Sequence, residues 1–340
     1  MSQMMGAQSV CFENPVSILG AAAVVGQKEG EGPLGTYFDM VCQDPMMGCK
    51  SWEEAESTLQ KEAAQLAMAK ANLDKQRIRM IFAGDLLAQS IASSFGIMDF
   101  RIPVYGLYGA CSTMGEALSL GAMAVAGGYG DYVLSLTSSH FASAEKEFRF
   151  PLAYGNQRPL SASWTVTGSG ACVLGKDGGK AEITGVTTGK IIDNGLKDSM
   201  NMGACMATAA SDTIYHNLMD FQRTPKEYDK IITGDLGSIG QKILWDVLGE
   251  RGIDISDCHM DCGIEIFDEE KQDTHAGGSG CGCAASVFAA YILPKIESGE
   301  WKRVLFVPTG ALLSKVSFSE GNSVPGIAHA VVVEAKGGAK

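Results

Sequence analysis

The chain has 340 residues, of which 46% are hydrophobic and 19% are charged, and its formal net charge is −12 at pH 7. This composition suits a globular protein with a large apolar core, in one large or two moderate domains. The acidic balance argues against long-range attraction to nucleic acid or anionic lipid. We expect no transmembrane helix and no signal peptide, because Met1–Phe12 lacks a basic segment followed by an apolar one and no apolar run is long enough.

Ten cysteines occur without a signal peptide, so we expect reduced thiols in a cytosolic compartment. Close pairs occur as Cys258-x3-Cys262 and Cys281-x-Cys283, and no Cys-x2-Cys pair is present. This spacing argues against paired zinc knuckles. We therefore predict neither a metal site nor a cofactor, except for calcium if it arrives with a bound ligand.

The first part of the chain alternates between predicted strands and helices. A strand near Gln8–Phe12 precedes a loop through Pro33. Ser51 and Glu54 form a capping box, and apolar residues at helical spacing predict an amphipathic helix from there to about Ala71. Continuous apolar runs predict strands at 79–83, 131–137 and 166–174, and a run of small apolar residues predicts a buried helix at 117–126.

The second part repeats this order. Asp85 and Asp235 follow corresponding strands, and Cys111 and Cys281 precede corresponding buried helices. Matching elements in the same order favour a duplicated strand–helix unit. We predict two similar halves, 1–180 and 181–340, whose mostly parallel sheets are covered on both faces. The predicted elements of the second half are helices around 211–220 and 284–293 and strands at 230–233, 303–307 and 325–334.

The turn Gly109–Thr113 leads directly into the first buried helix, with Cys111 expected at the first helical turn. A thiol there faces free backbone N–H groups and the positive end of the helix dipole, which lower its pKa and favour the thiolate. The alternative is a buried structural cysteine, the usual place of a free thiol. The flanking glycines and the buried helix favour a functional turn.

Nine short motifs carry a resemblance to known proteins: Gly30–Gly35, Ala83–Leu87, Gly109–Thr113, Thr137–His140, Thr165–Ala171, Thr233–Leu236, Gly277–Cys281, Thr309–Ser314 and Ile327–His329. With the duplicated α/β half and the cysteine at the tip of a buried helix, they resemble the thiolase superfamily, which includes the ketoacyl synthases. The closer resemblance is to the stage V sporulation protein AD family of spore-forming Firmicutes.

This resemblance implies a five-layered α/β/α/β/α fold of two duplicated halves with mostly parallel mixed sheets, and a homodimer. It also implies a role in dipicolinic acid uptake into the forespore, together with membrane proteins of the same operon. The expected location is the forespore or spore cytoplasm, peripheral at the spore inner membrane. Because the sequence predicts no transmembrane helix, attachment would come through partners.

A condensing enzyme of this superfamily needs an oxyanion hole and groups that activate its thiol, which histidines, or a His and an Asn, of the second half supply. Here the corresponding turns carry Gly234–Leu236 and Gly277–Gly280 instead. His140 ends a strand beside the Cys111 turn, so it is either a site residue or a satisfied core imidazole. The other histidines are interpreted as solvated (His216, His259, His275) or structural (His329).

The pocket without its full catalytic set favours a non-catalytic binding protein on an enzyme scaffold, and the resemblance implies dipicolinic acid as its ligand. A flat pyridine with two carboxylates needs backbone N–H donors, hydroxyls and an apolar slot. Carboxylates in the pocket would shape it, or meet the ligand as its calcium chelate, or only cap turns after strands. The candidate binding residues are Asp85, Cys111, Ser112, Thr113, Glu116, Ser139, His140, Asp235, Gly278 and Ser279, with Ser138 as a further hydroxyl and Arg149 and Arg158 as alternative carboxylate clamps.

Two other functions stay open. One is an acyl-thioester acyltransferase or condensing enzyme with Cys111 as nucleophile. The other is a purely structural dimer that scaffolds a transport complex.

Overall fold

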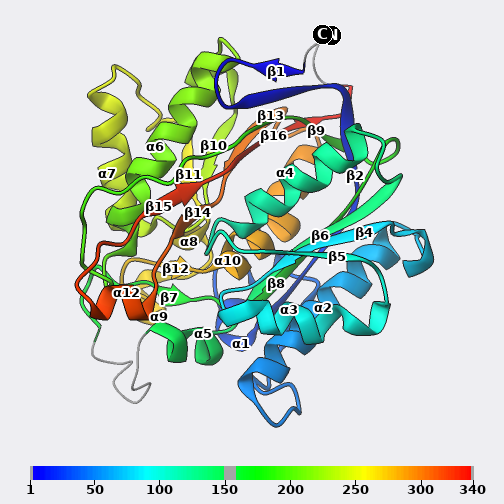
Figure 1. Cartoon of the computed structure of the whole chain (residues 1–340), viewed down its shortest axis with the longest axis horizontal. Coiled ribbons are helices and arrows are strands. Elements are labelled where there is room, and N and C mark those ends of the chain that lie inside the picture. Colours follow the sequence, from blue (N-terminus) through cyan, green and yellow to red (C-terminus); the bar gives the residue numbers. More distant parts are fainter. Residues whose placement is uncertain (1–2, 149–157, 338–340) are drawn as a thin grey trace.

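The structure is a computed structural model that describes residues 3–148 and 158–337 (Figure 1). The first half contains β1 (Met4–Met5), β2 (Ser9–Gly26), α1 (Gln27–Gly30), β3 (Met40–Cys42), α2 (Trp52–Lys70), β4 (Met80–Gly84), α3 (Ile91–Ile97), β5 (Val104–Leu107), α4 (Thr113–Ala126), β6 (Tyr132–Ser139), α5 (Phe141–Phe148), β7 (Trp164–Thr165) and β8 (Gly168–Gly175). The second contains β9 (Ala181–Thr187), α6 (Met202–Asp220), β10 (Lys230–Thr233), α7 (Gly237–Gly249), β11 (His259–Asp261), α8 (Cys262–Glu265), α9 (Glu269–Gln272), β12 (Gly278–Ser279), α10 (Cys281–Val287), α11 (Leu293–Glu297), β13 (Arg303–Val307), β14 (Thr309–Ala311), α12 (Lys315–Ser319), β15 (Gly326–Ala328) and β16 (Ala330–Ala335).

The main strands form one hydrogen-bonded path in the order β11-β10-β13-β16-β9-β2-β8-β6-β4-β5. This path consists of two blocks with the same pairing pattern. In the first block β2–β8 and β8–β6 are antiparallel, whereas β6–β4 and β4–β5 are parallel. In the second block β9–β16 and β16–β13 are antiparallel, whereas β13–β10 and β10–β11 are parallel. The repeated order of elements in the sequence thus becomes a repeated order of strands.

Strand β2 joins the two blocks, and it is longer than the strand near Gln8–Phe12 that the sequence predicts. Its first part pairs with β9 and its second part with β8, with an irregularity between Cys11 and Val16. The small residues that suggested a loop instead allow helix α2 to approach closely: a Cβ at Gly20 would lie 2.6 Å from the amide nitrogen of Ala71. Gly- and Ala-rich sequence here indicates tight backbone packing rather than a turn.

The helices and sheet blocks form layers (Figure 1). Helix α2 packs on the outer face of the first block, and α6 and α7 cover the second block. Helices α4 and α10 lie between the blocks and share one central core, which contains Met114, Leu118, Phe288 and Phe306. The predicted α/β architecture with helix layers outside and between mixed sheets is therefore confirmed.

The predicted helix at 52–71 matches α2, whose cap is Ser51 accepting a hydrogen bond from the Glu54 backbone N–H at 3.2 Å. Helix α6 starts nine residues before the predicted position, because Asn201 caps it by accepting from the Ala204 N–H. Among the described residues no helix is both long and apolar enough to cross a bilayer.

Candidate functional site

The turn before α4 has the strained backbone of an elbow. Ala110 adopts a positive φ of 50°, a left-handed conformation that costs a non-glycine residue about 1–2 kcal/mol. Helix α4 begins at Thr113, so Cys111 lies in the turn itself, just before the N-cap Ser112. Strand β14 supports the turn: a Cβ at Gly310 would lie 2.3 Å from the Gly109 carbonyl oxygen. Packing of the second half thus holds the elbow of the first.

The N–H groups and hydroxyls that we expect to bind an anion at this turn form hydrogen bonds within the turn. The backbone N–H groups of Ser112 and Thr113 donate to the carbonyls of Gly109 and Ala110. Their hydroxyls donate to the same two carbonyls, at 2.7 and 2.6 Å. These groups therefore have partners within the turn, and a contact of Ser112 or Thr113 with a ligand carboxylate stays a prediction.

The thiol of Cys111 is buried, with 6% of the residue exposed, and the carboxylate of Asp235 lies near it. Burial and the negative charge of Asp235 raise the pKa of Cys111 well above its usual value. The predicted thiolate is therefore wrong, because desolvation outweighs the helix dipole.

Asp235 accepts from the Gly280 N–H at 2.9 Å and from the Thr309 hydroxyl at 2.7 Å. Burial raises its pKa to about 7. This carboxylate therefore connects the elbow of the first half to β14 and α10 of the second.

A second thiol lies beside the first. Cys281 opens α10, forms one buried cluster with Leu86, Cys111 and Ala144, and its thiol donates to the Ser138 carbonyl at 2.9 Å. The Ser139 hydroxyl donates to the Val166 carbonyl at 2.7 Å. We did not select Cys281 from the sequence, although its place in the second Gly-rich turn corresponds to that of Cys111.

Asp85 caps the chain after β4. One carboxylate oxygen accepts from the Leu87 N–H at 2.8 Å, and the other accepts from the Ser93 N–H and hydroxyl at 2.8 and 2.6 Å. Burial raises its pKa. The capping alternative thus accounts for all the hydrogen bonds of this side chain, and a ligand contact for Asp85 stays a prediction.

Glu56 is a buried acid that the sequence analysis missed. It accepts hydrogen bonds from the hydroxyls of Ser138 and Ser143, and burial raises its pKa to about 8, with a further contribution from Asp85. A signal existed: Glu56 lies four residues after Trp52, on the apolar face of the predicted helix. A charged residue on such a face indicates a buried polar network.

The remaining candidates do not converge on one point. Glu116 is half-buried, and one of its carboxylate oxygens has no hydrogen-bond partner among the described residues. Gly278 and Ser279 form β12, which pairs with β7 through the backbone. Arg158 donates to the Asp273 carbonyl at 2.7 Å, and Arg149 lies outside the described residues.

The partners of the five histidines are groups other than Cys111. The ring of His140 contacts the Pro45 carbonyl at 2.8 Å and accepts from the Ala142 N–H at 3.1 Å, so it is a satisfied imidazole. His259 is buried rather than solvated, and burial lowers its pKa to about 4. The other contacts are those of His216 with Asp212, of His259 with Thr233, Gln241 and Trp245, of His275 with Pro159 and Asp273, and of His329 with the Gly189 N–H.

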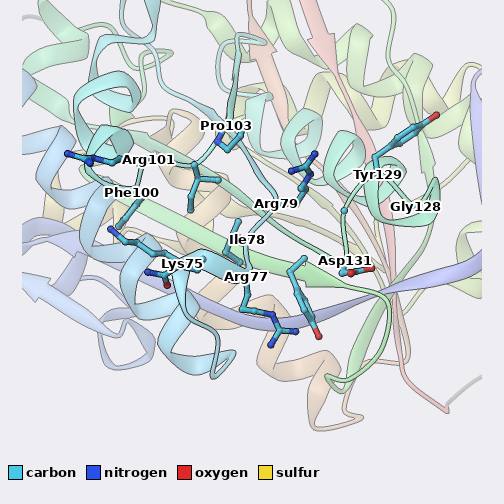
Figure 2. Close-up of a pocket in the computed structure, with 14 residues that line it drawn as sticks. Lys75, Arg77, Ile78, Arg79, Phe100, Arg101, Pro103, Gly128, Tyr129 and Asp131 are labelled. Carbon is cyan, nitrogen blue, oxygen red and sulfur yellow. The ribbon is translucent and has the colours of Figure 1, made fainter.

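A cleft of about 670 Å³ lies at the opposite end of the first sheet block, where β4, β5 and β6 begin (Figure 2). Asp131 at its rim pairs with Lys176 at 2.9 Å. No cluster of histidine, cysteine and carboxylate side chains in the described part of the chain has the arrangement of a metal site. The cleft is basic on an acidic protein, since Lys75, Arg77, Arg79 and Arg101 line it.

Solved structures with this arrangement belong to the thiolase-like class. The chain is similar to 3-oxoacyl-[acyl-carrier-protein] synthase III from Aquifex aeolicus (15% identity, 94% of this chain and 99% of that chain, TM-score 0.57). It is also similar to a variant of Xanthomonas campestris OleA (16%, 95% and 99%, TM-score 0.57) and to the priming β-ketosynthase of the R1128 polyketide pathway (13%, 97% and 99%, TM-score 0.56). At these identities the likeness establishes the fold and not the activity.

Within this class, residues 6–334 match the family model of stage V sporulation protein AD. The chain is also 42% identical to stage V sporulation protein AD of Bacillus subtilis (strain 168), over 99% of both chains. The chain belongs to this family of sporulation proteins, as the sequence motifs indicated.

The buried carboxyl of Asp235 predicts a pH effect on stability. Its pKa is about 7 in the folded state and about 4 in an unfolded chain, so between these values only the folded state holds the proton. The stabilisation is complete below pH 4 and is lost as the pH rises to 7. The Asp235→Asn variant should lose this pH dependence. Its free energy of unfolding, measured with urea, should fall less steeply than that of wild type between pH 4 and 7, by roughly 1 kcal/mol per pH unit. The same pH slope in wild type, in Asp235→Asn and in the exposed control Asp246→Asn would contradict this assignment.

Proposed function

We propose that the protein binds dipicolinic acid without catalysing a reaction, and that it serves dipicolinate uptake into the forespore during sporulation. The family supports the sporulation role. The observation that carries the non-catalytic part is the environment of Cys111: its thiol is buried near the carboxylate of Asp235, and both the burial and this negative charge raise its pKa. A nucleophilic cysteine needs the opposite environment, an accessible thiolate beside a cationic or basic partner.

The alternative function, acyl transfer through Cys111, is favoured by one observation. The left-handed Ala110 keeps the cysteine on a strained elbow, and backbone strain of this kind clusters at functional sites. However, proton transfer from Cys111 to Asp235 is unfavourable, because the thiol has a far higher pKa than the carboxyl group. We therefore assign the elbow to the scaffold.

We also propose a homodimer formed through β5. This strand is the end of the hydrogen-bonded path, so one of its edges pairs with no strand in the described part of the chain. Tyr105 on β5 is 59% exposed, and Phe95 and Met98 nearby in the sequence are about as exposed. An unpaired edge strand with exposed apolar side chains is a template for pairing with a second copy.

We place the protein at the membrane surface of the forespore, beside membrane proteins of its operon. The basic cleft of Figure 2 supports contact with anionic headgroups. Distant acidic groups are screened over a Debye length of about 8 Å at physiological ionic strength, so a local group of cations decides the contact. Tyr129 at the cleft is 73% exposed, and tyrosine is common at membrane interfaces.

Calorimetric titration tests the binding function. Purified protein should bind dipicolinate, either alone or together with calcium, and should show a raised melting temperature under the condition in which it binds. Mass spectrometry after mixing with acyl-CoA or an acyl carrier protein should detect no lasting adduct. Absence of heat and of a thermal shift would contradict binding. An adduct that is lost in Cys111→Ala would instead favour the acyltransferase. If spores with variants of the candidate binding residues contain normal amounts of the protein and of dipicolinate, the structural scaffold would be favoured.

Light scattering after size exclusion tests the dimer. Wild type should elute as two chains, and Tyr105→Glu should elute as one, because the charge would be buried at the pairing edge. Tyr129→Glu places the same charge on another exposed tyrosine and should leave the dimer intact. A Tyr105→Glu protein that stays dimeric would exclude β5 as the interface.

Vesicle flotation tests the membrane contact. Binding to phosphatidylcholine vesicles should appear when phosphatidylglycerol is added and should weaken with salt. The double variant Arg77→Glu/Arg79→Glu should lose binding, whereas Lys226→Glu/Lys242→Glu, with the same change in net charge, should retain it. Equal losses in both variants would mean that only net charge matters and would rule out the cleft as the contact.

A further inference from the structure

The basic cleft of Figure 2 is built in part by one copy of a duplicated element. In the first half a short 3₁₀-helix, Lys75–Arg77, leads into β4, and in the second half another, Pro225–Glu227, leads into β10. Asn72 and Gln222 precede these helices at the same distance and both have a positive φ, of 53° and 52°. Because the two backbones are alike, a difference between their side chains is not required by the fold.

The charges of the two copies are opposite. Arg77 and Arg79 occupy the positions that Glu227 and Asp229 occupy in the second half. Both of these carboxylates stabilise the scaffold: Glu227 accepts from the Thr224 N–H at 2.7 Å, and Asp229 accepts from two backbone N–H groups around the start of β13, at 2.6 and 2.9 Å. A guanidinium has no acceptor, so the arginines of the first half cannot take these roles.

The cations of the basic cleft have no carboxylate partners. The cleft carries four exposed cations, namely Lys75, Arg77, Arg79 and Arg101. None of them forms an ion pair within the described part of the chain. Two carboxylates lie close by, but Asp131 pairs with Lys176 at 2.9 Å and Asp99 pairs with Lys61 at 2.7 Å. The positive charge of the cleft is therefore left for an external anion.

The four cations surround the cleft and do not meet at one point. The side chains of Arg77, Arg79 and Arg101 point in different directions (Figure 2). The Arg77 guanidinium lies over the Tyr132 ring, 5.2 Å from its centroid, and the Lys75 ammonium donates to a backbone carbonyl at 3.3 Å. A single phosphate would contact few of these cations, whereas several phosphates linked in one molecule would contact more of them.

The walls of the cleft are partly apolar. Ile78 and Phe100, both buried, and Pro103 line it together with the cations. Walls of low dielectric focus the field of charges of one sign and strengthen their attraction for an anion. Arg101 follows the 3₁₀-helix Met98–Phe100 with a φ of 56°, a left-handed conformation that favours glycine. The chain thus has an arginine at the cleft where the backbone favours a smaller residue.

We propose that the basic cleft binds a ligand that carries several linked phosphate groups. Such a ligand matches the number and the spread of the cations, and arginine binds phosphate oxygens through paired N–H donors. The phosphates belong either to a free oligophosphate or to a lipid with two phosphates in its headgroup, since both present the same chemistry. This inference deepens the proposed membrane contact and rests on it where the ligand is a lipid.

Titration calorimetry with inorganic phosphates of increasing length tests the site. Orthophosphate, pyrophosphate and tripolyphosphate are titrated into wild type, Arg77→Gln, Arg79→Gln and Arg77→Glu/Arg79→Asp. The affinity of wild type should rise with the number of phosphates. Each single variant should weaken tripolyphosphate binding about tenfold, which corresponds to the loss of one charge-assisted pair. The double variant, which introduces the residues of the second half, should abolish binding.

Two matched controls separate local from general effects. Arg251→Gln removes an exposed arginine that also lies over a tyrosine ring, that of Tyr215, at 4.8 Å. Lys226→Gln removes a cation from the corresponding 3₁₀-helix of the second half. Both should bind tripolyphosphate as wild type does. Melting temperatures of all variants establish that the fold is kept, and Arg79→Gln is the decisive variant if the double variant does not fold.

Vesicle flotation distinguishes the two sources of phosphate. Phosphatidylcholine vesicles contain either cardiolipin, a lipid with two phosphates, or phosphatidylglycerol at equal total charge. A preference for cardiolipin that tripolyphosphate abolishes by competition would support the inference and assign the ligand to a lipid. Tripolyphosphate binding without vesicle binding would support a free oligophosphate and would contradict the membrane contact.

The remaining outcomes contradict the inference. Equal binding of both kinds of vesicle without tripolyphosphate binding would overturn the linked-phosphate site and keep the membrane contact. Tripolyphosphate binding that is no tighter than orthophosphate binding, that Arg79→Gln leaves unchanged, or that the two controls weaken equally would also overturn the site. Binding of neither phosphates nor vesicles would overturn both proposals.

Discussion

The buried thiol of Cys111 in the first half lies close enough to the buried carboxyl of Asp235 in the second half for each to shift the pKa of the other. This pair brings the elbow of α4 next to the carboxylate that receives the Gly280 N–H at the start of α10. Both groups are buried, so neither can be left without the other at low cost. Because the thiol keeps its proton in this pair, the same contact that closes the interface between the halves removes the nucleophile. A buried, protonated thiol stabilises the contact between the halves, whereas acyl transfer would need an exposed thiolate at the same position. The structure has the buried thiol.

The starts of α4 and α10 are closed in the same way as the contact between Cys111 and Asp235. Helices α4 and α10 begin side by side, and the donors of the first turn satisfy their own carbonyls rather than an external anion. At the end of β6 the chain leaves this closed centre within one residue, and His140 lines a cleft of about 400 Å³ together with Trp52, Phe141 and Trp164.

Much of the fold could be predicted because the duplication places Asp85 with Asp235 and Cys111 with Cys281 in the sequence itself. The site could be predicted less well. Residue type and local spacing identify a turn, but the pKa of Cys111 depends on Asp235, which is distant in the sequence, and on burial that only packing determines. Glu56 carried a local signal on its helix face, whereas the approach of Lys28 to Trp164 carried none, because it depends on how α1 meets β7.

The basic cleft and the cleft lined by His140 lie at opposite ends of the same strand. Tyr132, the first residue of β6, lines the basic cleft, and His140, just after the last residue of β6, lines the other. Eight residues of strand span about 26 Å. A small ligand therefore cannot contact both clefts at once, so substitutions at one cleft report on that cleft alone.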